Sequence, residues 1–284
     1  MEQTIRRSID MTDHYAVIGN PVAHSKSPQI HAAFAAETGE DIDFSRLLAP
    51  LDGFRRSVDE FLAGNGRGLS VTLPFKLEAL QLAARATERA RLAGAANCLK
   101  LDDAGWHADN TDGAGLLTDL IDNLGFDPGG KRVLLIGAGG AARGILRPLL
   151  EAHPVLLHVA NRTRQTAVEL AQACAPNAGG KVTAGDIASA AAGRFDLVIN
   201  ATSASLRGDD LALPAGLYAE GSLAYDLVYA RDSTPFMQLA LSQGAARVAD
   251  GLGMLVEQAA ESFFLWRGLR PATAPVLAML RNTL

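Results

Sequence analysis

Three short polar motifs in the first half of the chain carry side chains that end predicted strands or start predicted helices, and such clusters could form a reacting site. Lys76 follows the strand-like stretch 68–73 and Pro74, a residue type that ends strands. Asn97 stands where a predicted strand begins, and Asp112 lies in the sequence DNTDG at a predicted helix start. Taken singly, Lys76 could be the solvated start of a helix, and Asp112 could simply favour the helix dipole.

Two serines lie close together in the sequence AHSKSP, at the start of a predicted helix over residues 27–39. Ser27 is expected to be the N-cap of this helix, with Pro28 at its first position and Gly39 just past its end. Ser25 precedes it by two residues. Hydroxyl groups beside a helix N-terminus suit a carboxylate ligand, so these serines add an anion-binding group to the polar motifs.

The sequence GAGGAA at 137–142 has the form G-x-G-x-x-A, the fingerprint of a dinucleotide-binding turn. It follows a continuous apolar strand at 131–137 and opens a helix, which is the context that the fingerprint requires. Gly137 would make the tight turn, Gly139 would let the backbone approach a pyrophosphate, and Ala142 would allow close packing. A plain strand-to-helix turn is the alternative interpretation.

The residues after the next predicted strand indicate which dinucleotide binds. An NAD site usually carries an acidic residue there, which binds the ribose hydroxyls. This chain instead has Asn161, Arg162, Thr163 and Arg164, and no carboxylate, in the sequence ANRTRQT. Because arginine suits a 2′-phosphate, the sequence predicts NADP rather than NAD.

Strand and helix patterns alternate along the chain, which predicts an α/β protein with a doubly wound parallel sheet. The first half has predicted helices at 27–39, 54–64, from 76 and 111–125, and predicted strands at 15–19, 43–49, 68–73, 96–101 and 105–109. The second half has predicted helices at 141–151, 252–268 and 275–283, and predicted strands at 131–137, 156–162, 196–202, 223–229 and 246–251. Pro148 lies inside one of these helices, and Gly144 is expected to relieve the clash of its ring.

The composition narrows the class of protein. The chain has 284 residues, 48% hydrophobic and 20% charged, which is enough for two globular domains. A net charge of -5 without a basic block argues against nucleic acid, and no apolar run approaches the roughly 18 residues of a membrane span. Cys98 and Cys174 form no metal or disulfide pattern, so we expect no metal and a soluble, cytoplasmic protein. The N-terminus does not resemble a signal peptide, and Met11 is an alternative start.

The chain resembles the biosynthetic type of the shikimate dehydrogenase family, from about Tyr15 onward. The resemblance rests on motifs that occur in that family's order: VIGNPVAHSKSP, SVTLPFK, GAANCL, DNTDGAG, GAGGAARG, NRT, INATSASL, YDLVY and DGLGMLVEQA. Any one motif could occur by chance, but the ordered set is very specific. It implies the reversible reduction of 3-dehydroshikimate to shikimate by NADPH, with hydride transfer to the C3 carbonyl.

The resemblance also implies roles for individual residues. Lys76 and Asp112 would form the catalytic pair, with Lys76 the natural proton donor, although a close Lys–Asp pair acts as a unit. The substrate carboxylate would be held by Ser25 and Ser27, and its ring hydroxyls by Thr72, Asn97, Tyr229 and Gln258. Besides Asn161, Arg162, Thr163 and Arg164, the cofactor-binding residues would be Glu88, Gly137, Ala138, Gly139, Gly140, Ala141, Leu227 and Gly251.

One residue departs from the family pattern. Ser70 stands where the family usually has asparagine, and a hydroxyl is shorter than an amide. This leaves open how strongly that edge of the site binds substrate, and whether it distinguishes shikimate from quinate. The presence of both Ser25 and Ser27 favours shikimate.

Two domains with a cleft between them follow from the resemblance. Residues 1–113 plus 250–284 would form an α/β substrate domain, and residues 114–249 a Rossmann-type NADP domain. The protein would be a monomer or a homodimer. The alternatives are a quinate/shikimate dehydrogenase of broader specificity and a non-catalytic NADP sensor, which would be expected to lack Lys76 or Asp112. A methylenetetrahydrofolate dehydrogenase would not explain AHSKSP or DNTDG.

Overall fold

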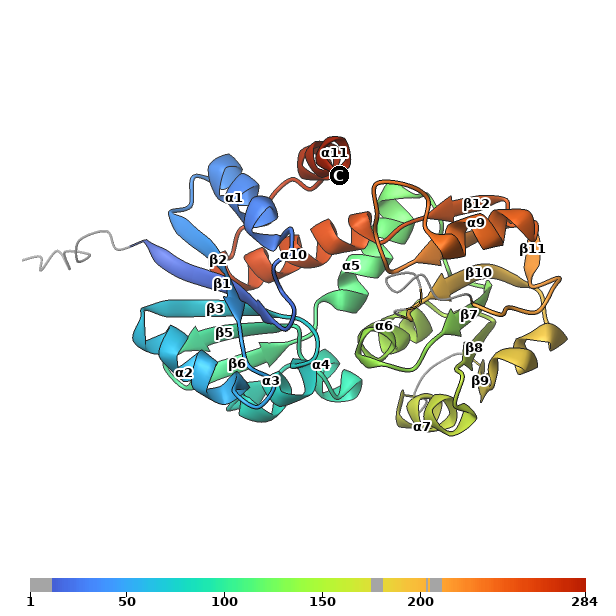
Figure 1. Ribbon diagram of the computed structural model, residues 1–284, viewed down its shortest axis with the longest axis horizontal. Coiled ribbons are helices and arrows are strands. Elements are labelled where there is room, and N and C mark those ends of the chain that lie inside the picture. Colours follow the sequence, from blue (N-terminus) through green and yellow to red (C-terminus); the bar gives the residue numbers. More distant parts are fainter. Residues whose placement is uncertain (1–11, 175–180, 203, 205–210) are drawn as a thin grey trace, which may run out of the picture.

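A computed structural model of the chain describes residues 12–174, 181–202, 204 and 211–284, so that Met11 lies outside the described residues. The described residues form two six-stranded sheets, each covered by helices, with α5 (Asp112–Thr118) and α10 (Leu252–Arg267) lying between the two halves (Figure 1). The predicted two-domain α/β fold is confirmed. Within the described ranges no helix has both the length and the apolar character needed to cross a membrane.

The first sheet is mixed and has the order β2-β1-β3-β5-β6-β4. Its first three strands in space run parallel, β5 and β6 form an antiparallel hairpin, and the short β4 pairs with β6. The bounds are β1 (Asp13–Gly19), β2 (Ile42–Leu48), β3 (Gly66–Val71), β4 (Arg85–Ala86), β5 (Cys98–Asp102) and β6 (Gly105–Asp109). The sequence pattern predicted all of these except the two-residue β4.

The second sheet is entirely parallel, with the doubly wound order β12-β11-β10-β7-β8-β9. Its strands are β7 (Arg132–Ile136), β8 (Leu156–Ala160), β9 (Lys181–Gly185), β10 (Phe195–Asn200), β11 (Tyr218–Asp226) and β12 (Arg247–Ala249). The sequence prediction missed β9, because this edge strand, KVTAG, is half-exposed and has a single large apolar residue.

The helices connect these strands. The first half holds α1 (Ser27–Thr38), α2 (Phe54–Ala63), α3 (Lys76–Leu82), α4 (Glu88–Ala93) and α5 (Asp112–Thr118), which continues as the π-helix η1 (Asp119–Asn123). The second half of the sequence holds α6 (Gly140–Glu151), α7 (Arg164–Cys174), the 3₁₀-helix η2 (Ile187–Ala192), α9 (Pro235–Ser242), α10 (Leu252–Arg267) and α11 (Ala274–Thr283). A single α-helix over 111–125 was expected, and its second half is wound as a π-helix instead.

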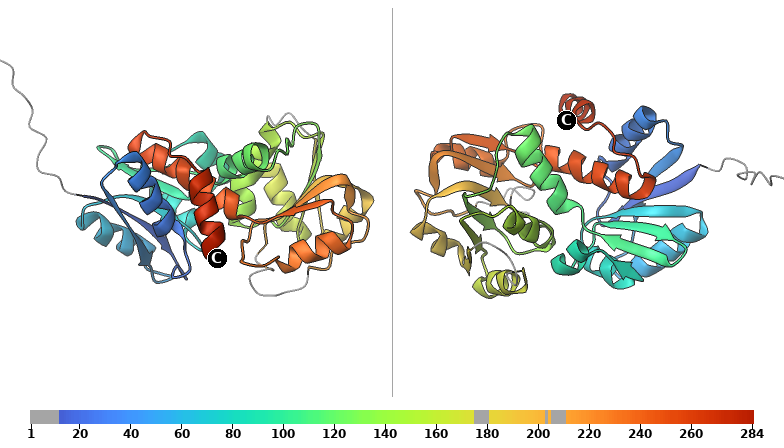
Figure 2. Two further views of the ribbon diagram at one scale, coloured as in Figure 1. Left: turned by 90° about the horizontal axis from the view of Figure 1, so that it is seen from above. Right: turned by 180° about the vertical axis from the view of Figure 1, so that it is seen from behind.

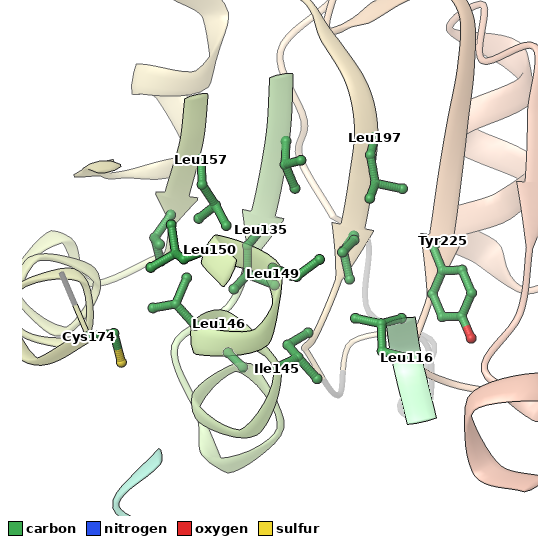
Figure 3. Close-up of a cluster of buried hydrophobic side chains, with 14 of the residues drawn as sticks. Leu116, Leu135, Ile145, Leu146, Leu149, Leu150, Leu157, Cys174, Leu197 and Tyr225 are labelled. Carbon is green, nitrogen blue, oxygen red and sulfur yellow. The ribbon is translucent and has the colours of Figure 1, made fainter. Parts of the chain in front are cut away.

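The second sheet is buried on both faces, as its apolar strands predicted. In β7, Leu135 packs with Leu146 and Leu149 of α6, while the neighbouring Leu134 packs on the opposite face with Phe236 of α9. Figure 3 shows the first of these clusters, with α6 lying over β7 and β8. This packing fixes α6, and with it the glycine-rich turn from which the helix starts.

The C-terminal helices return to the first half of the molecule. Ile30 and Phe34 of α1 share a core with Val256 and Phe263 of α10 and with α11. Figure 2 shows α10 running alongside α1 and α5 in both views. The first and last parts of the chain therefore build one common core.

His31 of α1 is an ionisable side chain inside this core. It is fully buried, its ring stacks on Phe44 at 4.2 Å, and Phe34 and Trp266 lie close by. Neither ring nitrogen has a hydrogen-bond partner among the described residues. Burial among aromatic rings disfavours the charged form and lowers the pKa of His31 from 6.5 to about 3.

We expect His31 to make the protein less stable in acid. The unfolded chain takes up a proton near pH 6.5, whereas the folded chain does so only near pH 3, so unfolding takes up a proton between these values. The free energy of unfolding should fall by about 1.4 kcal/mol per pH unit below about pH 6.5. Urea titrations at several pH values should show this slope in the wild type. His31→Phe and His31→Leu should both lack it, whatever their stability at neutral pH. Variants whose pH dependence matches the wild type would contradict this assignment.

Candidate active site

A cavity of about 250 Å³ lies between the two halves of the molecule. Its walls come from the ends of β1 and β3, the starts of α1, α3 and α5, the segment after β11, and α10. All the residues predicted to contact substrate line this one cavity: Ser25, Ser27, Thr72, Lys76, Asn97, Asp112, Tyr229 and Gln258. Residues from distant parts of the sequence are thus brought together at one place.

Lys76 and Asp112 form a buried ion pair in this cavity. The Nζ atom of Lys76 lies 2.5 Å from Oδ2 of Asp112, and the two side chains are 15% and 8% exposed. Phe75, which is fully buried, anchors the turn after β3 and places Lys76 at the first position of α3. Asp112 is the first residue of α5, where the helix dipole favours a negative charge. The two elements therefore present opposite charges to each other at their starts.

Asn97 fixes the orientation of the Asp112 carboxylate. Its Nδ2 atom donates to Oδ1 of Asp112 at 2.8 Å, so that the two carboxylate oxygens have different partners. The same amide group lies 3.2 Å from Oε1 of Gln258, and its oxygen accepts the backbone N–H of Thr111 at 2.7 Å. Asn97 therefore links the strand β5 to α5 and α10.

Thr111 is a member of this network that the sequence prediction did not include. Its hydroxyl lies 3.2 Å from Ser262 of α10 and 3.4 Å from Gln258, and the residue is fully buried. Its position inside DNTDG, next to Asp112, was the only signal available. The hydroxyl ties the start of α5 to α10.

The start of α1 differs from the prediction. The N-cap position is Lys26, no side chain caps it, and Ser27 is already inside the helix. The expectation that Ser27 is the N-cap is wrong, because its backbone N–H donates to Oγ of Ser25 at 3.3 Å. The two hydroxyls lie 3.1 Å apart in the cavity wall, and Arg46 holds the carbonyl of Ser25 from outside.

Two further hydroxyl groups line the cavity. Tyr229 follows β11, and burial raises the pKa of its phenol, so it remains a neutral donor at physiological pH. Ser70, which departs from the family pattern, lies near the end of β3 opposite Cys98 and is 8% exposed.

Neither Cys98 nor Cys174 is in a disulfide, and both are buried. No group of three or more potential metal ligands is found among the described residues.

The turn between β7 and α6 has the geometry of a dinucleotide-binding turn. Gly137 has φ +110°, a conformation that favours glycine, and a Cβ there would lie 3.1 Å from the backbone of Ala201. At Gly139 and Gly140 a Cβ would meet no atom within 4 Å, so the N-terminal end of α6 is open. Ala138 and Ala142 are buried beneath it. A pyrophosphate therefore fits against this helix start.

The segment after β8 lies beside this turn, because β7 and β8 are neighbours in the sheet. Asn161 donates to the carbonyl of Thr163, and the side chains of Arg162 and Arg164 are exposed there without a nearby carboxylate in the sequence. These residues fit a cofactor with a 2′-phosphate.

Of the residues predicted to lie near the nicotinamide, some line the cavity and one does not. Leu227 and Gly251 line the cavity, as does Ala141. A Cβ on Gly251 would lie 2.2 Å from the carbonyl of Leu227, so this glycine permits a close backbone approach. Glu88 is exposed at the start of α4 and does not line the cavity.

Asp109, three residues before Asp112, is the centre of a second buried polar cluster. Its carboxylate accepts hydrogen bonds from Nε and Nη2 of Arg89 at 2.6 and 2.5 Å, and from Thr87 at 2.6 Å. Burial alone would raise the pKa of Asp109, but these hydrogen bonds and the charge of Arg89 outweigh it and hold the pKa below its usual value. Arg89 also contacts Glu261 of α10 at 3.0 Å. The cluster fastens the end of β6, from which the Asp112 loop continues.

Profiles of known protein families match most of the chain. The shikimate dehydrogenase substrate binding domain matches residues 17–99, shikimate / quinate 5-dehydrogenase matches residues 122–207, and the shikimate 5′-dehydrogenase C-terminal domain matches residues 251–281. A shikimate dehydrogenase (NADP(+)) from Dechloromonas aromatica is 57% identical over 274 residues, which cover 96% of this chain and 99% of that protein.

Solved structures give the same picture. An Ael1 enzyme from Pseudomonas putida is similar with a TM-score of 0.88 and 47% identity, over 94% of this chain and 98% of that one. Shikimate 5-dehydrogenase from Thermus thermophilus, in complex with NADP(H) and shikimate, is similar with a TM-score of 0.84 and 32% identity. That match covers 96% of this chain and the whole of that one.

The Arg89–Asp109 pair should contribute strongly to stability. Asp109 is 2% exposed, so Asp109→Ala would leave a half-buried guanidinium without its main partner. We expect a loss of about 3 kcal/mol in the free energy of unfolding, measured by urea titration. The double variant Arg89→Met/Asp109→Leu should recover most of it, because no unpaired charge remains.

A matched control is the exposed pair of Arg56 and Glu60 on α2, whose side chains are 84% and 64% exposed. Arg56→Ala should change the free energy of unfolding by less than about 0.5 kcal/mol. Equal losses in the free energy of unfolding for Asp109→Ala and Arg56→Ala would contradict the stronger contribution of the buried pair.

Proposed function

Because the chain belongs to the shikimate dehydrogenase family and is an NADP-dependent shikimate dehydrogenase of aromatic amino acid biosynthesis, we propose that Lys76 and Asp112 perform its proton transfer. The observation that carries this proposal is the buried Nζ–Oδ2 contact of 2.5 Å in a cavity that also holds every other predicted substrate contact. The cavity of about 250 Å³ suits a substrate with a single six-membered ring.

The polar groups of the cavity divide according to what they can bind. Ser25 and Ser27 offer two hydroxyl groups 3.1 Å apart beside the start of α1, where a carboxylate is favoured. Ring hydroxyls would meet the remaining donors and acceptors of the wall, which are Thr72, Asn97, Tyr229 and Gln258. This arrangement would orient shikimate with its carboxylate at α1 and its reacting carbon near Lys76.

The proton moves between the substrate oxygen and the Lys76–Asp112 pair. When bound, NADPH supplies the hydride that reduces the carbonyl carbon. The Lys76 ammonium gives a proton to the oxygen that gains negative charge, and Asp112 keeps the ammonium aimed at that oxygen. Asn97 holds the other carboxylate oxygen, so the pair keeps one orientation. Because two ionisable groups this close exchange a proton as a unit, we assign the proton to the pair.

The cofactor-binding residues can likewise be assigned to the parts of NADP that they would bind. Gly137, Ala138, Gly139, Gly140 and Ala141 would hold the pyrophosphate at the open start of α6. The exposed segment Asn161, Arg162, Thr163 and Arg164 would bind the adenosine 2′-phosphate. Leu227 and Gly251 would border the nicotinamide through backbone groups. Glu88 stays in this set as a prediction from the family resemblance.

We also propose the domain limits and the state of the protein. Residues 1–113 plus 250–284 would be the substrate domain, supported by the core that α1 shares with α10 and α11. Residues 114–249 would be the NADP domain, supported by the core around α6. Two buried free cysteines suit the reducing cytoplasm. The protein would act there as a monomer or homodimer, which sedimentation can decide.

The substrate range is tested by initial rates with shikimate and with quinate, each with NADP and with NAD. We expect turnover mainly with shikimate and NADP, because Ser25 and Ser27 favour that substrate and Arg162 that cofactor. Comparable turnover of quinate would place Ser70 first among the residues to replace, by Ser70→Asn.

Lys76→Ala should lower kcat by about 10²- to 10⁴-fold, the usual contribution of a positioned acid or base. The affinity for NADP should stay close to the wild type, and the exposed Lys131→Ala should behave like the wild type throughout. The melting temperature of Lys76→Ala should fall, because the buried Asp112 carboxylate loses its partner, so turnover is compared at a temperature where the variant is folded. Near-normal turnover by well-folded Lys76→Ala protein would remove the assigned role.

Arg162→Ala should weaken NADP binding about tenfold or more, because it removes a charge-assisted hydrogen bond to phosphate. NAD binding should change little, and the exposed Arg55→Ala on α2 should affect neither. Dissociation constants from fluorescence titration decide this. Equal losses for both cofactors would contradict the phosphate contact.

A further inference from the structure

The start of α5 and the middle of α6 lie as close together as their backbones allow. A Cβ built on Gly113 would lie 2.2 Å from Cγ of Pro148 and 2.8 Å from the carbonyl oxygen of Gly144. Gly113 is the residue after Asp112, and α6 belongs to the other half of the molecule. The proposed catalytic carboxylate therefore sits directly at the contact between the two halves.

Gly144 occupies the critical place in this contact. A Cβ there would lie 2.9 Å from Oδ2 of Asp112, 3.0 Å from Oδ1 of Asn110 and 3.1 Å from Cβ of Asp112. Real Cβ atoms are seldom this close to their neighbours, so the atoms around residue 144 would have to shift. Oδ2 is the oxygen that accepts the hydrogen bond from Lys76. A side chain at 144 would therefore press on the atom that holds the lysine.

The proline in this helix does not explain the glycine. Pro148 lies inside α6 as the sequence predicted. A proline ring crowds the carbonyl of the residue four positions earlier, and a residue of any type has that carbonyl. The atoms nearest to a Cβ at Gly144 belong to Asn110 and Asp112, not to Pro148. The expectation that Gly144 relieves a ring clash is therefore replaced by a different reason, which is the room that Asp112 needs.

The same helix begins at the proposed cofactor site. Gly139 is the N-cap of α6, and Ala141 lines the active-site cavity. Gly144 follows Gly140 by four residues, about one helical turn. Because α6 packs on both β7 and α7, the open start of the helix and the contact of Gly144 with Asp112 belong to one packed element.

We propose that Gly144 is a positioning residue, through which α6 sets the Asp112 carboxylate against Lys76 once the cofactor holds the start of that helix. The proposal rests on the catalytic roles of Lys76 and Asp112 given above. It adds that the bare backbone at residue 144 is required for catalysis and not for folding.

Gly144→Ala is the direct test. Alanine is the better helix former, so the melting temperature should be equal or higher if the surroundings adjust. The dissociation constant for NADP, measured without substrate, should stay within about threefold of the wild type, while kcat falls about tenfold or more, because a small misplacement of a catalytic group is costly. Glu151→Ala, on the exposed side of the same helix, should match the wild type. A wild-type kcat in Gly144→Ala would overturn the proposal.

A double-mutant cycle separates this effect from a general disturbance of α6. Asp112→Ala removes the oxygen that alanine at 144 would meet, so Gly144→Ala should lower kcat little further in that background. The same factor in both backgrounds would overturn the proposal. If Gly144→Ala lowers the melting temperature, it should lower it less in the Asp112→Ala background than in the wild type, and an equal drop in both would also count against the proposal. Normal activity in Asp112→Ala alone would instead refute the proposed catalytic pair.

Discussion

The buried ion pair between Lys76 and Asp112 is the interaction on which the rest of this structure depends. Taking two charges out of water costs several kcal/mol per ion, and their attraction offsets this cost only if their geometry is fixed and their other hydrogen bonds are made. Asp112 meets these conditions with Asn97 on one oxygen, the backbone of a helix start beneath it, and the side chain of Asn110 on its own N–H. The loop that carries it is in turn fastened by the Arg89–Asp109 cluster.

The helix α5 is held at both ends, which explains how this pair keeps its place between two domains. At the far end, Asp119 accepts a hydrogen bond from the hydroxyl of Tyr225 in the second sheet at 2.6 Å. Burial raises the pKa of Asp119, although hydrogen bonds from Tyr225 and Asn123 counter it. A Cβ on Gly253 of α10 would lie 1.9 Å from Oδ1 of Asp119, so α10 closes tightly over this point. The α5 helix therefore connects the substrate half to the cofactor half and is fixed at both ends.

The sequence could predict those features that depend on local pattern. Buried strands, the glycine-rich turn and the residues at strand ends are readable, because parallel strands bring their C-terminal ends to one edge of a sheet. Other features could not be predicted. Ser27 is not the N-cap because Ser25 accepts its N–H, β9 has too weak an apolar pattern, and the π-helix after α5 has no sequence signature. The network around Thr111 joins residues far apart in sequence, and only tertiary packing brings them together.

The charged side chains around the cavity come from one half of the molecule, so the other half acts on the Lys76–Asp112 pair by contact and not by charge. Among the described residues that line it, the side chains of His24, Lys76 and Asp112 are the ones of histidine, lysine or acidic type, and all come from the first half. The second half contributes Ala141 and Leu227, and the neutral hydroxyl of Tyr229. A charged side chain brought in by α6 would change the electrostatic field at the pair whenever the helix moved, because charges interact strongly in a cavity with little water. A glycine in contact with Asp112 can limit the position of the carboxylate without adding any charge. The absence of a side chain at residue 144 therefore allows the cofactor half to influence the geometry of the reacting pair while its electrostatics remain determined by the substrate half.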